Sequence, residues 1–529
     1  MNKNKNLIIL IIVIILVSFI ISTAAAEDNL RIKVNQRPLN LNPIYAANDT
    51  ELMIIRQLFD NLVKYDKNGE IAADLVESWK EDSSASVFKF KLKKDVYFHK
   101  YKIDGKEVKK EKRRVRADDW KWSLEYLASP QNKSPYAELL KKVKGYQDYR
   151  QGSSDEISGI KVLDDYQLQI ELNQPYAPFI NNLTKEAAVV LPKEAVLNEN
   201  KNFSISPVGT GAFREINLSE NKVTLSKNKE YWKNNYQKEK LPYLNQIEIY
   251  FNDFDLLNDY QSFDLYQLNS EDFKKYNEMK DKFSSYQLQE IKNGIYYYLA
   301  VDCSSYQKNQ AKIKNIKKNI GNFLKEEDLI EKLNSNKIIS ISNTNNQIIF
   351  DRLDNCLQCS QNSAEADFEV QNQELLDLYI NNSDQNLKFA ELINKQLRDI
   401  DLNIKKYNWA DYLKKLQQSN LNNQLFIMSY DYQNKFDFIY DNFYSKSDKN
   451  YSKYQNSRLD NLVEYLMLNN NQQSKKRAYQ IIEEILMQEN PFLISIQGGE
   501  SYLMSEKISE PDWFSNIYLD NNFEKLFFK

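Results

Sequence analysis

Histidine, cysteine and glycine are scarce in this chain of 529 residues, and each scarcity excludes a class of function. The one histidine, His99, cannot form a metal site built from several histidines. Three cysteines are too few for a disulfide scaffold. With 11 glycines, the chain contains neither a glycine-rich phosphate loop nor a dinucleotide-binding motif. No nucleophile–base pair is evident either, so we expect no catalytic residues, no metal and no cofactor.

The charge balance is close to neutral, which excludes a second class of partner. Lysine and arginine number 71 against 74 acidic residues, a net charge of −3. A protein that coats nucleic acid needs a basic stripe, so we expect no nucleic-acid partner. What the chain has in abundance is tyrosine, with 35 residues among 13% aromatics. Tyrosine side chains can stack and hydrogen-bond at the same time.

The first residues have the pattern of an export signal. Lys3 and Lys5 precede an apolar run from residue 7 to residue 21, and small residues follow up to Ala26. The run is shorter than the roughly 20 residues of a comfortable membrane span. We therefore predict a signal peptide over residues 1–26 and a mature chain that is periplasmic or extracellular. Retention of this segment as an uncleaved anchor is the alternative that the sequence leaves open.

The rest of the chain is predicted to form one mixed α/β body. Phe88, Phe90 and Leu92 alternate with lysines, as in a half-buried strand, and residues 166–172, 247–249 and 400–404 also read as strands. Apolar residues at helical spacing predict two amphipathic helices near the end of the chain, one over residues 459–467 and one over 478–486. No linker rich in proline, glycine or serine divides the body, so any domains are joined by short crossings.

Several sequence blocks resemble a known family when they are taken together and in order. These are 74–79 (DLVESW), 96–99 (VYFH), 117–120 (ADDW), 207–213 (PVGTGAF) and 228–232 (NKEYW). They are similar to the family-5 extracellular solute-binding proteins, the peptide/nickel receptors of ABC importers. The segments around Trp409 and Asp431 resemble the oligopeptide-binding branch most.

The resemblance implies an α/β, two-lobed periplasmic-binding-protein-like fold of class II, in its large type with an extra α/β domain. The expected division is a signal peptide at 1–26, lobe I at 27–62, 177–285 and 491–529, the extra domain at 63–176 packed on lobe I, and lobe II at 286–490. Such a protein closes its two lobes on a ligand held in the cleft between them.

The resemblance also implies a function. The chain would capture short peptides and deliver them to an ABC transporter permease in the membrane, as a monomer and without covalent chemistry. An oligosaccharide or another small solute is the alternative ligand, and a signalling receptor is the alternative partner. Nickel is disfavoured by the single histidine.

Six residues match ligand-contacting positions of the family. Asp431 matches the carboxylate that holds the peptide α-ammonium, and Trp409 matches an aromatic that lines side-chain pockets; a surface-loop aspartate and ordinary core packing are the respective alternatives. Tyr297 lies in a strand expected to cross into lobe II, and Tyr136 in the extra domain. The adjacent pair of Arg37 and Pro38 occupies the strand that meets the peptide backbone in relatives.

Arg37 departs from the family pattern, which has an acidic residue near this position. A guanidinium there favours a carboxylate on the ligand over a cation.

Three further features are interpreted as structural. Gly209 and Gly211 bracket a turn in which side chains would clash, and His99 lacks the partners of a catalytic base. Cys356 and Cys359 form a lone Cys-x-x-Cys pair in a polar stretch from 343 to 374. A short disulfide, with Cys303 as the other candidate partner, and free thiols both stay open and are favoured over the third alternative, a redox or metal motif.

Overall fold

The computed structural model describes residues 29–66, 69–103, 106–107, 113–198, 202–233, 240–301, 374–396, 400–417, 425–431, 435–469, 471–489, 491–509 and 523–528. The predicted signal peptide, the three cysteines and the stretch 343–373 lie outside these residues. Among the described helices, none combines the length and the apolar character that crossing a bilayer requires.

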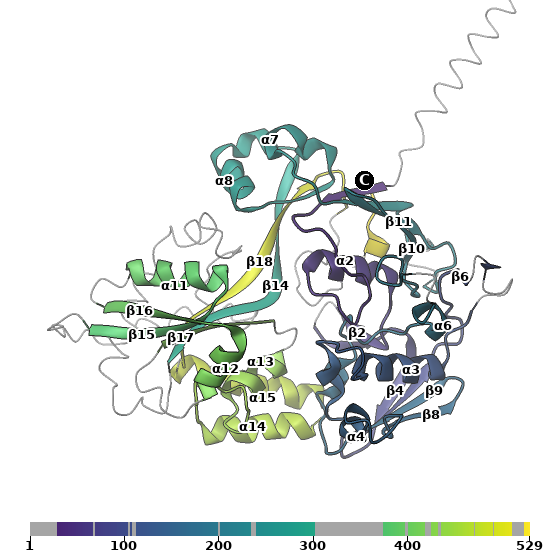
Figure 1. Ribbon diagram of the computed structural model, residues 1–529, viewed down its shortest axis with the longest axis horizontal. Helices are drawn as coiled ribbons and strands as arrows, with labels where there is room; N and C mark the ends of the chain where they lie inside the picture. Colours follow the sequence, from purple (N-terminus) through teal and green to yellow (C-terminus); the bar gives the residue numbers. More distant parts are fainter. Residues whose placement is uncertain are drawn as a thin grey trace, which may run out of the picture.

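A ten-stranded mixed sheet runs through the molecule and belongs to both lobes (Figure 1). Its strands, in spatial order, are β10 (Phe213–Leu218), β11 (Lys222–Lys227), β12 (Gln246–Tyr250), β1 (Asn29–Lys33), β13 (Leu265–Gln267), β18 (Phe492–Ser505), β14 (Tyr286–Val301), β17 (Leu425–Asp431), β15 (Glu374–Asn381) and β16 (Ile400–Tyr407). We call the part from β10 to β13 lobe I and the part from β17 to β16 lobe II.

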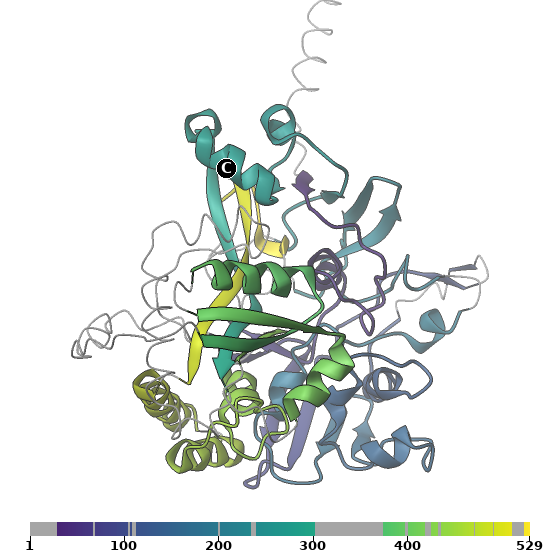
Figure 2. The same cartoon turned by 60° about the vertical axis from the view of Figure 1, so that its left-hand side comes forward.

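The long strands β14 and β18 connect the lobes. They pair antiparallel from Tyr286 opposite Ser505 to Ala300 opposite Phe492, with a register shift between Lys292 and Tyr296. One end of β18 also pairs with β13 of lobe I, whereas the other end of β14 pairs with β17 of lobe II. The two strands stay side by side in both views of the ribbon (Figures 1 and 2). They link the two lobes, and we call them the hinge strands.

The extra domain is built on a four-stranded antiparallel sheet. Its strands are β4 (Val76–Glu81), β5 (Val87–Leu92), β9 (Gln167–Glu171) and β8 (Ile160–Asp164) in spatial order, and it contains the helices α3 (Ala117–Ala128), η1 (Ala137–Leu140) and α4 (Tyr146–Arg150). The short hairpins are β2 (Val63–Tyr65) with β3 (Ile71–Ala73) and β6 (Lys102–Ile103) with β7 (Lys106–Glu107).

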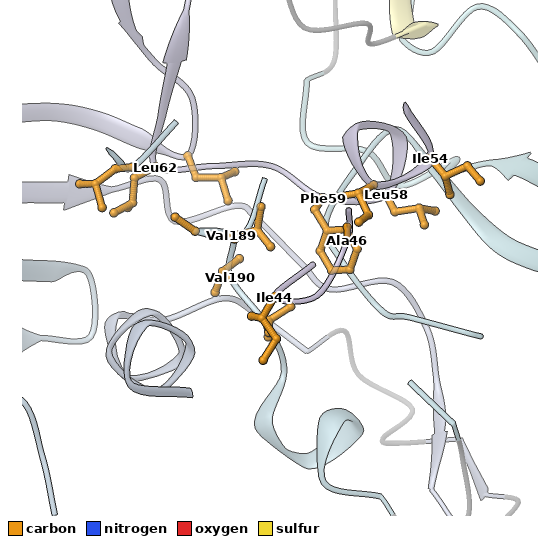
Figure 3. Close-up of a cluster of buried hydrophobic side chains, with 14 of the residues drawn as sticks. Ile44, Ala46, Ile54, Leu58, Phe59, Leu62, Val189 and Val190 are labelled. Carbon is orange, nitrogen blue, oxygen red and sulfur yellow. The ribbon is translucent and has the colours of Figure 1, made fainter. Parts of the chain in front are cut away.

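One continuous hydrophobic core joins the extra domain to lobe I. It contains Ile32 and Ile249 from the sheet of lobe I as well as Phe88 and Leu168 from the sheet of the extra domain. At the junction, residues from helix α2 (Asp49–Leu58) and the segments beside it pack with two valines of a connecting segment (Figure 3). The labelled residues there are Ile44, Ala46, Ile54, Leu58, Phe59, Leu62, Val189 and Val190. The short helices α5 (Phe179–Asn182) and α6 (Lys193–Val196) flank this segment.

Lobe II has a core of its own, formed where helices cover its strands. The helices are α11 (Asp384–Gln396), α12 (Trp409–Gln417), α13 (Lys435–Phe443), α14 (Ser457–Leu468) and α15 (Gln472–Glu489). Helix α14 shows why this sequence is helical: the Asn456 side chain caps its first turn, and Leu459, Val463 and Leu466 form its buried stripe. A third small core lies around α7 (Leu256–Asp259), η2 (Tyr260–Ser262), α8 (Ser270–Glu278) and η3 (Lys280–Phe283), and η6 (Phe523–Lys525) ends the described chain.

The main expectations for secondary structure are confirmed. Strand β5 buries Phe88, Phe90 and Leu92 and exposes the lysines between them. Strands β9, β12 and β16 and helices α14 and α15 also lie where the sequence patterns place them. The two-lobed α/β architecture is confirmed as well. The exact boundaries between lobes and extra domain stay a prediction.

Candidate functional site

Two of the predicted ligand-contacting residues lie on neighbouring strands where lobe II meets the hinge. In the β14–β17 pairing, Tyr297 is opposite Ser429, and Ile295 is opposite Asp431, the last residue of β17. Asp431 and Tyr297 are therefore two register positions apart on adjacent strands. The fold thus brings these two predicted positions close together.

Tyr297 connects this region with lobe I. Its side chain is 6% exposed. Burial and then the negative charge of Asp49 raise the pKa of Tyr297 to about 12, so its hydroxyl is neutral at physiological pH. Asp49 is the first residue of helix α2 in lobe I. An acidic group of one lobe thus acts on a tyrosine of the strand that leads into the other.

The same aspartate contacts the second hinge strand. The carboxyl group of Glu500 in β18 is hydrogen-bonded to the side chains of Asp49, Tyr502 and Gln267. The Tyr502 hydroxyl donates to Oε2 of Glu500 at 2.7 Å. Removal from water, and next the charge of Asp49, raise the pKa of Glu500 to about 8. Glu500 therefore holds a proton at neutral pH, which allows the two carboxyl groups to hydrogen-bond.

Arg37 and Pro38 lie in lobe I, in the segment that leads towards α2. Arg37 is exposed, and its guanidinium carbon lies 5.5 Å from the centre of the Phe251 ring. The Asn48 side chain, which caps α2, donates to the carbonyl oxygen of Arg37 at 3.4 Å. Pro38 is buried. Of this pair, the arginine is the one that solvent reaches.

Trp409 is exposed, which argues against the alternative that it is an ordinary core residue. It begins helix α12 in lobe II and is 43% exposed, so it is not an ordinary core residue. Its ring centre lies 6.1 Å from that of Tyr412. Tyr412 is fully buried, and its hydroxyl donates to the carbonyl oxygen of Ile427. The buried tyrosine holds the helix on β17, and the tryptophan lies one turn before it at the surface.

Tyr136 has a different environment from the other candidates. It is half-buried against the core shared by lobe I and the extra domain. Its hydroxyl donates to the carbonyl oxygen of Ala46. The structure thus places Tyr136 at the junction of lobe I with the extra domain.

His99 is a structural residue, as the sequence predicts. Its backbone amide donates to the Gly209 carbonyl oxygen at 2.8 Å, and its Nε2 lies 3.0 Å from the Gly211 carbonyl oxygen. Burial lowers the pKa of His99 to about 4, so the ring is neutral. Within the described part of the chain, no three or more histidine, cysteine or acidic side chains are grouped as metal ligands.

A comparison with known families decides the affiliation of this chain. The model of the bacterial extracellular solute-binding proteins, family 5, matches residues 70–451. The chain belongs to this family.

Curated relatives of this family-5 protein match over limited segments. The chain is 25% identical over 234 residues to the oligopeptide-binding protein OppA of Bacillus subtilis, covering 43% of this chain and 40% of OppA. It is 29% identical over 211 residues to the dipeptide-binding protein of Escherichia coli, covering 37% of each. The chain thus matches about two fifths of the length of these relatives.

Solved structures agree over nearly the whole length. The unliganded open form of the periplasmic murein tripeptide-binding protein MppA superposes with a TM-score of 0.70 at 18% sequence identity. The superposition covers 95% of this chain and 98% of MppA. The fold is therefore the two-lobed fold of the periplasmic binding proteins.

Sequence reasoning missed the acidic residues at the hinge of this family-5 protein. Asp49 has the sequence signature of a helix N-terminus, where an acidic residue follows the Asn48 cap and needs no other explanation. Glu500 lies in a strand segment without a motif. Only the pairing of β18 with β13 and β14 sets Glu500 near α2, and no local pattern encodes that contact.

Proposed function

We propose that this protein captures short peptides between its lobes and delivers them to the permease of an ABC transporter. The observation that carries the proposal is the position of Asp431 at the end of β17, beside the hinge strand that holds Tyr297. A carboxylate there suits a peptide α-ammonium, because a desolvated cation needs a fixed counter-charge. The peptide-binding relatives of Bacillus subtilis and Escherichia coli support the same ligand class.

In this proposal the chain is a binding protein without catalytic residues, and it works outside the cytoplasmic membrane. Capture rests on higher affinity for the ligand in the closed arrangement than in the open one. Export by the N-terminal segment 1–26, action as a monomer and the permease partner are parts of the same proposal.

The test compares peptides with free and with acetylated amino termini. Wild-type protein should bind trialanine at least about tenfold more tightly than N-acetyl-trialanine. This ratio corresponds to about 1.4 kcal/mol of binding free energy. Asp431→Ala should lose this preference. Glu391→Ala, which removes an exposed carboxylate of α11 in the same lobe, should keep it. Equal binding of both peptides by the wild type would overturn the role of Asp431.

Arg37 is the proposed partner of a ligand carboxylate. It is exposed in lobe I, and a guanidinium binds carboxylates through two parallel hydrogen bonds. Wild-type protein should therefore prefer a free carboxyl terminus to an amidated one, and Arg37→Glu should reverse this preference. Unchanged selectivity in Arg37→Glu would remove the basis for this role.

An oligosaccharide is the second candidate ligand, and the 43% exposure of Trp409 favours it. An exposed indole stacks on a sugar ring as well as on a peptide side chain. Native mass spectrometry of protein purified from its host, followed by fragmentation of released ligand, separates the two. Release of a series of short peptides would support the peptide proposal. Release of a single saccharide would overturn it and support the oligosaccharide instead.

A further inference from the structure

Tyr176 packs against two hydrophobic cores that belong to different bodies of the molecule. It lies against the core shared by lobe I and the extra domain, and also against the core of lobe II. Its ring centre lies 5.9 Å from that of the buried Phe436 in α13, in an edge-on arrangement at 74°. The extra domain and lobe II therefore touch at this tyrosine, apart from the hinge strands β14 and β18.

The backbone around Tyr176 is hydrogen-bonded to both bodies through two successive amides. The amide of Tyr176 donates to the carbonyl oxygen of Ala85 in the extra domain at 3.0 Å. The amide of Ala177 donates to the carbonyl oxygen of Met467 in α14 at 2.7 Å. This second bond fixes the segment to lobe II. Figure 1 shows α14 and α15 next to the extra domain at this end of the molecule.

Charges on the two sides of this contact are complementary. Lys142 of the extra domain lies 5.4 Å from the centre of the Tyr176 ring and interacts with Asp448 of lobe II. The neighbouring Lys141 acts on Asp441 in α13. Glu81 at the end of β4 interacts with Lys475 in α15, with the opposite polarity. Opposite charges on facing surfaces favour one relative position of two bodies over others.

The half-buried side chain of Tyr176 is close to charged and polar groups of lobe II. Burial is the first cause that raises the pKa of Tyr176 well above its usual value, and the charges of Asp437 and Asp441 and the nearby Tyr440 and Tyr479 follow. Groups of lobe II thus act on the hydroxyl end of this side chain as well as on its ring.

We propose that Tyr176 is a latch between the extra domain and lobe II, a second link that limits how far the two lobes move apart about the hinge strands. Two strands alone leave lobe II free to turn about them. A second link at a distance from the hinge strands restricts that rotation, because the Ala177 hydrogen bond and the Tyr176–Phe436 contact must break before lobe II moves away. The extra domain contributes no strand to the hinge, but through Tyr176 it limits how far the lobes open.

The test replaces Tyr176 and measures the arrangement of the lobes in the full-length mature protein without ligand. Tyr176→Ala should increase the radius of gyration measured by small-angle X-ray scattering. It should also make the Ala177 amide exchange with solvent at least about tenfold faster, since local opening then costs less free energy. Tyr176→Phe keeps the ring contacts and should leave the radius of gyration as in the wild type.

Tyr149→Ala is the matched control. Tyr149 is a half-buried tyrosine of α4 in the same domain, and its hydroxyl donates to the Glu125 carbonyl oxygen at 3.1 Å within that domain. Its removal disturbs the extra domain without touching lobe II, so it should not change the radius of gyration. The latch is refuted if Tyr176→Ala has the wild-type scattering profile, or if Tyr149→Ala expands the molecule equally.

Discussion

The ammonium group of Lys233 lies 3.2 Å from the carboxylate of Asp74 and joins lobe I to the extra domain inside the protein. The same ammonium lies 3.2 Å from Glu524 near the C-terminus and 3.9 Å from Asp60 after helix α2. The Tyr231 hydroxyl donates a hydrogen bond to Oε2 of Glu524 at 2.6 Å. One buried cation thus compensates three carboxylates that come from distant parts of the chain.

Replacing Lys233 by a neutral side chain should lower the free energy of unfolding substantially. Burial opposes the charge of Lys233, but Asp74 and Glu524 outweigh it and raise the pKa of Lys233 well above its usual value. Lys233→Met removes the cation that contacts all three carboxylates, so we expect a loss of about 3–5 kcal/mol in the free energy of unfolding. Urea unfolding at pH 7 measures it. The exposed Lys229, substituted by methionine, should change stability by less than about 0.5 kcal/mol. Equal losses in the two variants would contradict the prediction.

The glycines of the 207–213 segment allow a close approach of backbones. A Cβ at Gly209 would lie 2.0 Å from the Leu58 carbonyl oxygen, and one at Gly211 would lie 2.4 Å from that of Gln57. Gly209→Ala should therefore lower the free energy of unfolding by about 2–3 kcal/mol, the cost of overpacking.

Gly152 provides the comparison for this substitution. It has a φ of +75°, but no atom lies within 4 Å of the point that a Cβ would occupy, so alanine there meets backbone strain without a clash. Gly152→Ala should cost about 1 kcal/mol. If Gly209→Ala costs no more than Gly152→Ala, the backbones can separate and the close approach is not required.

Local patterns predicted much of the fold because they report burial on one side of an element. Phe88, Phe90 and Leu92 are buried in β5 because alternate residues of a strand face the same side. Leu459, Val463 and Leu466 are buried in α14 for the corresponding reason in a helix. The crossing of β14 has no such local signal and came only from the family resemblance. The path of β18 was not predicted: residues 491–529 were assigned to lobe I, but Phe492 at the start of β18 packs in the core of lobe II.

The candidate ligand residues stay predictions, and the sequence did not anticipate how two of them lie relative to each other. Asp431 and Tyr297 come from separate motifs, and only the pairing of β14 with β17 puts them on adjacent strands. The exposure of Trp409 depends on how α12 packs on β17 through Tyr412, and its sequence spacing fits a core residue equally well. The link between Asp49 and Glu500 depends on contacts over more than 400 residues of sequence, which periodicity does not report.

Glu500 should make the free energy of unfolding fall as the pH rises from about 5 to 8, while His99, whose pKa burial lowers to about 4, acts in the opposite direction in the lower part of this range. The Glu500 pKa of about 8 in the folded protein is above that of an unfolded glutamate, so between these values only the folded state holds the proton. The unfolded state therefore becomes favoured as the pH rises. Glu500→Gln keeps a neutral donor to Asp49 and should flatten the decline, so that the variant gains stability over the wild type at pH 8 but not at pH 5.

Thermal unfolding across this pH range measures the effect, and Glu248→Gln is the control. Burial opposes ionisation of Glu248, but the hydrogen bond and charge of Lys222 hold its pKa below the usual value. Glu248 is therefore ionised in both states from pH 5 to 8 and adds no slope there. A decline as steep in Glu500→Gln as in the wild type would assign the pH dependence to other groups, such as Asp60, whose pKa is raised to about 6 by burial and by Asp74.

Trp409 and Tyr412 should separate ligand binding from stability within one helix. Trp409 is 43% exposed, so Trp409→Ala should lower the free energy of unfolding by only about 1 kcal/mol. If it contacts ligand, the same change should remove most of the thermal stabilisation that a library of tri- to pentapeptides gives the wild type, because that stabilisation depends on affinity. Tyr412→Ala removes a fully buried ring and should cost about 3–5 kcal/mol in the absence of any ligand. A Trp409→Ala protein that is stabilised as strongly as the wild type by every peptide would place the ligand away from α12, on the side of Asp431 and Tyr297.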